Sequence, residues 1–72
     1  MALDPQMKVM LETSDPFEAL SSYAKQRLKA GLSNDEVLAE FEATRAYLRE
    51  IDNEEWEDAV MDVMDFIWLN KL

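Results

Sequence analysis

The sequence predicts an all-α protein, a compact three- or four-helix bundle in which a short N-terminal helix precedes three amphipathic helices. Apolar residues recur at intervals of three and four, the period of a helix with one buried face. Four helix-start signals divide the chain, and no alternating stretch is bounded by turn residues, so no strand is expected. The expected helices span residues 5–12, 16–30, 34–51 and 54–70.

The first two helices begin with the same signal, an aspartate directly before a proline. Asp4 precedes Pro5, and Asp15 precedes Pro16. Aspartate is a favoured N-cap, and proline at the first helical position loses nothing because its missing N–H has no intrahelical partner there. The second helix is expected to end at Gly31, which can adopt the left-handed conformation that follows many C-caps.

The third helix has the strongest start signal, Ser33 followed three residues later by Glu36. These two residues can form a capping box, in which each side chain accepts the other's backbone N–H. Arg45 flanks the apolar seam of this helix, so we expect its stem to lie along the seam and its guanidinium to pair with a carboxylate. The seam positions alternate in steps of four and three: Val37, Phe41, Thr44, Leu48 and Ile51.

The fourth helix has an unusually broad apolar surface. Either Asp52 or Asn53 is expected as its N-cap, with acids in the first turn where the helix dipole favours them. At roughly 100° per residue its apolar side chains cover about 220°, roughly twice the arc of an ordinary surface helix. This helix is therefore expected either at the centre of the bundle or shared with a second chain.

The length favours a single domain over residues 1–72 and leaves two assemblies open. A domain of this size buries only about 60% of its unfolded surface, so short helical chains often complete their core by dimerising. The first alternative is therefore a homodimer. The second is a monomer in which Trp56 and Trp68 belong to the core.

The charge is concentrated in the second half of the chain. Residues 32–72 hold twelve acids and three bases, whereas the first 31 residues hold four of each, and the net charge is −9. Such a field repels phosphates, so neither a nucleic acid nor a membrane is expected as partner. A basic protein would be attracted, although acids can also serve solubility alone.

Histidine and cysteine are both missing from the chain. The usual proton shuttle, the thiolate nucleophile and the commonest metal ligands are therefore missing too. We therefore expect no enzymatic activity and no cofactor. We also expect no metal site, because carboxylates spread along one exposed helix seldom converge on a cation. The longest apolar run, Phe66 to Leu69, is far below the roughly 20 residues of a membrane span, and no signal sequence is evident, so a cytoplasmic protein is expected.

Two function classes remain. The first is a protein-interaction module that binds a basic partner through charge complementarity around an apolar anchor, as small acidic immunity proteins, antitoxins and regulators do. The alternative is a self-associating helical structural module, in which a homodimer covers the exposed apolar side chains. The candidate partner-binding residues lie on the fourth helix: Glu54, Glu55, Asp58, Met61, Asp62, Asp65 and Trp68.

Overall fold

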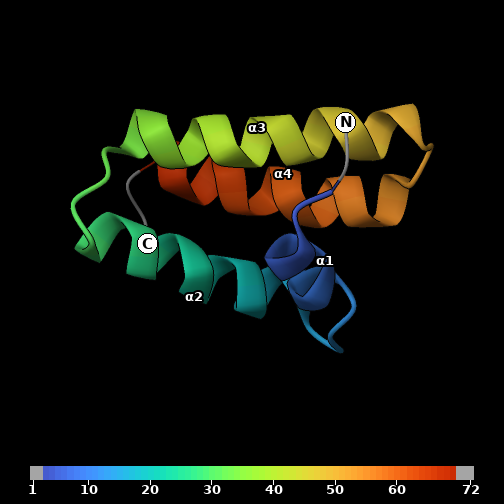
Figure 1. The fold of residues 1–72 in the computed structure, drawn as a ribbon, viewed down its shortest axis with the longest axis horizontal. Coiled ribbons are helices and arrows are strands. Elements are labelled where there is room, and N and C mark those ends of the chain that lie inside the picture. The colour runs from blue at the N-terminus through green and yellow to red at the C-terminus, as the bar shows by residue number, and fades with distance from the viewer. Residues whose placement is uncertain (1–2, 70–72) are drawn as a thin grey trace.

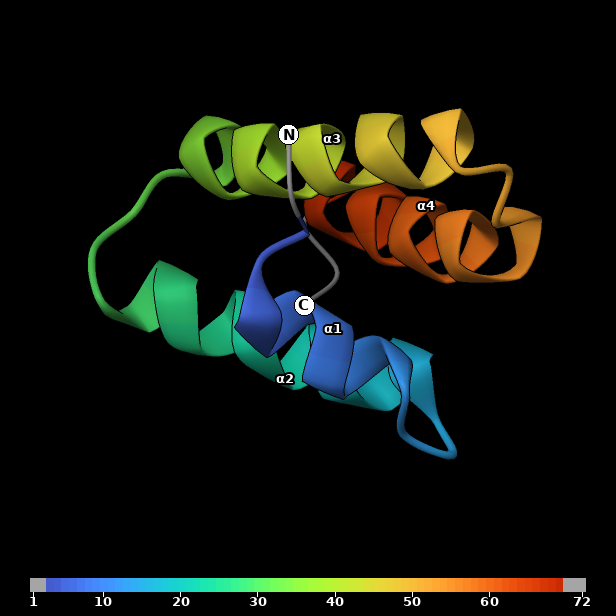
Figure 2. The same ribbon diagram turned by 45° about the vertical axis from the view of Figure 1, so that its right-hand side comes forward.

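The computed structural model describes residues 3–69, which form four α-helices and no strand. The three longer helices follow one another in alternating direction, and α3 and α4 lie side by side (Figure 1). The short α1 packs against α2 (Figure 2). The predicted all-α bundle is confirmed, with four helices in the described part of the chain: α1 (Pro5–Leu11), α2 (Pro16–Lys29), α3 (Asn34–Glu50) and α4 (Glu54–Trp68).

Each helix contributes at least two apolar side chains to one core. The predicted seam of α3 supplies its centre, since Phe41 is the largest fully buried side chain and Thr44 is buried beside it. The radius of gyration is 11.2 Å, the size expected of a compact chain of this length. The buried apolar residues are Met7, Leu11, Leu20, Ala24, Val37, Phe41, Leu48, Val60, Val63 and Ile67.

All four helices begin at a side-chain cap. The carboxylates of Asp4 and Asp15 accept backbone N–H groups two and three residues ahead. Ser33 and Glu36 form the predicted capping box, with reciprocal hydrogen bonds of 3.2 and 3.0 Å. Of the two expected caps of α4, Asn53 is the one used. Each helix start is therefore determined by residues within one turn of it.

The α2 and α3 helices end in the same type of hydrogen-bonded turn, but only α2 has glycine at the left-handed position of that turn. Gly31 follows the C-cap of α2 with φ +106°, as predicted. At the end of α3 this place is taken by Asp52, with φ +59°. The Asp52 N–H donates to the Arg49 carbonyl at 3.1 Å, and the Asn53 N–H donates to the Leu48 carbonyl at 2.9 Å. This pattern is a Schellman motif, and it reverses the chain directly into α4.

One predicted core position is wrong. Ile51 was expected to continue the apolar seam of α3, yet its side chain is 49% exposed. The physical reason is that α3 stops at Glu50 and the chain turns at Asp52, so Ile51 lies beyond the last buried residue of the seam, Leu48. The predicted ends at residues 12, 30 and 51 are the C-caps rather than the last helical residues, and residue 70 lies outside the described residues.

Candidate interaction surface

The outward side of α4 carries a row of carboxylates, which we call the acidic face: Glu54, Glu55, Asp58, Asp62 and Asp65. All five side chains are exposed. The helix is oriented by Val60, Val63 and Ile67, which are buried against the other helices and so turn the acids outward. The two glutamates lie in the first turn, where the helix dipole favours negative charge.

The acids of this face have no ion-pair partner among residues 3–69. Three other glutamates are paired instead: Glu40 with Arg27, and both Glu42 and Glu57 with Arg45. Two of the described arginines are thus held by acids elsewhere in the bundle. The acidic face consequently presents uncompensated negative charge to solvent.

Arg45 links α3 to α4 beside this face. Its guanidinium pairs with carboxylates, as predicted from the sequence. Its Nε donates to Glu42 Oε2 at 2.8 Å, and its Nη1 donates to Glu57 Oε2 at 3.1 Å. The hydrogen bond from Arg45 lowers the pKa of Glu42, and the same contact raises the pKa of Arg45. Glu57 therefore belongs to an interhelical contact rather than to the acidic face.

Replacing Arg45 by Gln is expected to raise the pKa of Glu42 toward its ordinary value of 4.5. A carboxyl group with a lowered folded pKa adds stability above its unfolded pKa, and this stability is lost as the pH falls through the folded pKa. The variant should therefore show a shallower loss of stability in acid. NMR titration of the Glu42 side chain measures the shift. Arg49→Gln, on the same helix and without a described ion pair, is the control, and an equal effect there would contradict the assignment.

A groove of about 400 Å³ runs between α3 and α4 next to the acidic face. Trp68 stands at its edge with 75% of the residue exposed, although the indole is among the largest apolar groups of the chain. A single copy of the chain therefore leaves Trp68 outside its core, whereas Trp56 packs against the core. The groove is lined by Leu38, Ala39, Glu42, Met64, Asp65 and Trp68.

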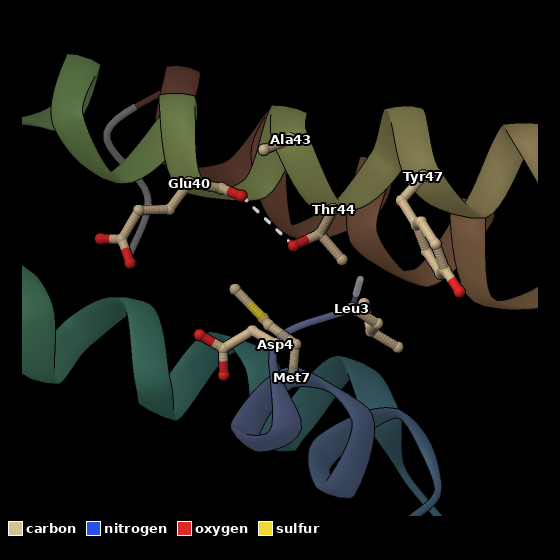
Figure 3. Close-up of a pocket in the computed structure, with 7 residues that line it drawn as sticks. All are labelled: Leu3, Asp4, Met7, Glu40, Ala43, Thr44 and Tyr47. Atoms are coloured by element: carbon tan, nitrogen blue, oxygen red, sulfur yellow. Dashed lines mark hydrogen bonds between the residues drawn. The ribbon is translucent and has the colours of Figure 1, made fainter. Parts of the chain in front are cut away.

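Two further depressions lie on the other side of α3 and on α1. A pocket of about 190 Å³ separates α3 from the start of α1, where Thr44 faces Met7 (Figure 3). The Thr44 hydroxyl donates to the Glu40 carbonyl at 3.3 Å, so this hydroxyl is held by its own helix. A wider groove of about 710 Å³ between α1 and α2 exposes Val9, and Arg27 is among its lining residues.

A polar cluster joins α2 to α3 near both depressions. Glu40 accepts from the Tyr23 hydroxyl at 3.1 Å and from Arg27 Nε at 3.1 Å. Burial, and then the Glu40 charge, raise the pKa of Tyr23, so the phenol stays protonated and keeps donating. Because each group is occupied by the others, the cluster stabilises the α2–α3 contact.

No family model, curated protein or solved structure matches the chain. Within residues 3–69, no three acidic side chains come together as a metal site would require, and no described helix is long and apolar enough to cross a membrane.

The seven residues predicted for partner binding all lie exposed on α4. The structure separates them into two groups, since five form the acidic face while Met61 and Trp68 lie on the flank that borders α3. Leu38 and Met64 line the groove together with Trp68, and the sequence pattern does not identify either of them as part of the surface. The local pattern of α3 does not show which residues of α4 Leu38 faces.

Proposed function

We propose that this chain is a protein-interaction module that binds a basic protein partner through the acidic face of α4. The proposal rests on one observation: the five carboxylates share one side of a helix, are all exposed and have no described cation within ion-pair distance. A field of one sign on one surface raises association rates with an oppositely charged protein by about 10- to 1,000-fold. Electrostatic complementarity also selects against acidic competitors.

The proposal is tested by reversing the charge at the middle of the face. Asp58→Lys combined with Asp62→Lys should weaken binding to the basic partner at least about ten-fold, because like charges then meet across the interface. The partner is first captured from lysate with tagged protein and released by salt, and its affinity is then measured with purified components. Circular dichroism should show helicity close to that of the unmodified chain.

A matched control separates a local effect from one of net charge. Glu12→Lys combined with Glu18→Lys changes the net charge by the same amount at the C-cap of α1 and in the first turn of α2, where both side chains are exposed. Binding should remain near that of the unmodified chain in this control. An equal loss in both double variants, or no loss in either, would overturn the docking role of the acidic face.

The second candidate function is self-association, and the exposure of Trp68 and Leu69 at the end of α4 favours it. A twofold dimer through this surface would place the acids of one copy near those of the other. Such a dimer should strengthen with added salt, whereas the complex with a basic partner should weaken. Sedimentation at rising salt concentrations distinguishes the two, and Trp68→Ala should dissociate the dimer.

A further inference from the structure

The strongest unexplained feature of the surface is the groove between α3 and α4. Its apolar lining comes from Leu38, Ala39, Met64 and Trp68, and it is an open, shallow depression of about 400 Å³. Trp is among the residues that most often dominate binding energy at interfaces, and a Met thioether adapts easily to a new neighbour. The residues that line the groove are therefore suited to bind an apolar side chain of a partner.

The charges around the groove define what else its occupant must carry. Asp65 lines it directly, and Asp58 lies two turns earlier, roughly 10 Å away along the axis of α4. Neither carboxylate has a described ion-pair partner, whereas Glu42 on the opposite rim is already held by Arg45. An occupant that inserts an apolar side chain is therefore flanked on the α4 side by free negative charge, and cationic groups must accompany its apolar anchor.

The same charges argue against two other occupants. A second copy lying antiparallel along α4 would bring its own Asp58 and Asp65 to this rim, with no described base on either α4 to neutralise them. An anionic membrane surface would be repelled, because such surfaces attract Lys and Arg and not carboxylates. A helix is the element that fits the remaining requirement, since it can present an apolar stripe with cations spaced one and two turns apart beside it.

We infer that the α3–α4 groove binds a basic amphipathic helix of the partner, which seats an apolar side chain against Trp68 and pairs lysine or arginine with Asp58 and Asp65. The inference rests on the proposed function and specifies the partner's binding element. It also gives Trp68 a role distinct from that of the acidic face: the face provides attraction over distance, and the groove provides the apolar contact.

Three synthetic peptides of about 18 residues, or five helical turns, serve as probes. The first has a leucine stripe flanked by lysines, the second keeps the lysines but carries alanine in place of leucine, and the third keeps the leucines but carries glutamate in place of lysine. The protein carries Trp56→Phe, so that Trp68 is the only indole and its fluorescence reports on the groove.

The leucine–lysine peptide should bind saturably and shift Trp68 emission to shorter wavelength, because the indole leaves water. The alanine–lysine peptide should bind at least about ten-fold more weakly and without the shift, and the glutamate peptide should not bind. By calorimetry, Trp68→Ala and Leu38→Ala should each lower affinity for the first peptide several-fold. Val9→Ala, at an exposed site in the α1–α2 groove, should not.

The failure of this inference can be told from failure of the proposed function. If the leucine–lysine and alanine–lysine peptides bind equally, with salt sensitivity and no change at Trp68, the groove inference is overturned while docking on the acidic face stands. If neither peptide binds, the groove inference is overturned, whereas docking on the acidic face is decided separately by the Asp58→Lys and Asp62→Lys double variant with the captured partner. If Trp68 emission shifts on concentrating the protein alone and sedimentation shows a dimer, the groove is occupied by a second copy.

Discussion

Phe41→Ala is expected to lower the free energy of unfolding by about 3–5 kcal/mol, the usual loss for truncating a buried phenylalanine. Phe41 has no exposed surface and stacks on Tyr23 with ring centroids 6.2 Å apart, so its removal leaves a cavity between α3 and α2. A chain of this length has roughly 4–11 kcal/mol of stability in total. The substitution therefore removes a large share of it, and urea or thermal unfolding followed by circular dichroism measures the loss.

Phe66→Ala provides a matched control for this prediction. Phe66 packs edge-on against Phe17 with ring centroids 5.2 Å apart, but the residue is 39% exposed. The same truncation should cost clearly less there, because part of the ring already lies in water and the surrounding surface can close around the gap. Equal losses at the two positions would contradict the placement of the core around Phe41.

Leu11→Ala is expected to cost about 2–5 kcal/mol, but with a local rather than a general effect. Leu11 and Met7 are the two buried residues of α1. Isolated helices shorter than about 12–15 residues are marginal in water, so the seven residues of α1 depend on this docking for their helicity. Hydrogen exchange should therefore show faster exchange in α1 while the amides of α3 and α4 keep their protection.

Val9→Ala on the same helix is the comparison, because Val9 is 64% exposed. Substitutions at such surface positions usually change stability by less than about 0.5 kcal/mol. If Leu11→Ala instead lowered protection equally in all four helices, α1 would be part of the same cooperative unit as α3 and α4.

The helix starts could be predicted from the sequence because their causes are local. Asp4, Asp15, Ser33 and Asn53 each act on a backbone group within three residues. The structure confirms the first three caps, and for the fourth it selects Asn53 over the alternative, Asp52. The exposure of Ile51 could not be predicted, because helical spacing continues past the point where the chain turns. Asp52 gives little warning of that turn, since aspartate adopts positive φ less readily than glycine.

Part of the candidate site could be predicted because helical spacing is also a local property of the sequence. Helical spacing alone places the acids of α4 on one side, and they are exposed as expected. The groove depends on how α3 and α4 are rotated about their own axes, which brings Leu38 near Trp68 from thirty positions away. Such contacts between distant segments leave no periodic signal in either helix. The pairing of Glu40 with Tyr23 and Arg27 could not be predicted either, because it also joins residues on two different helices.

The tight turn at Asp52 has a consequence for how quickly the chain folds. Because the Schellman motif reverses the chain within residues 51–53, α3 and α4 can meet as soon as both have formed, with little loop entropy to overcome. Helical proteins dominated by contacts between sequence neighbours fold in microseconds to milliseconds. The α3–α4 hairpin is therefore expected to act as the folding nucleus, so the surface that carries both the acids and the groove is assembled early, before α1 docks.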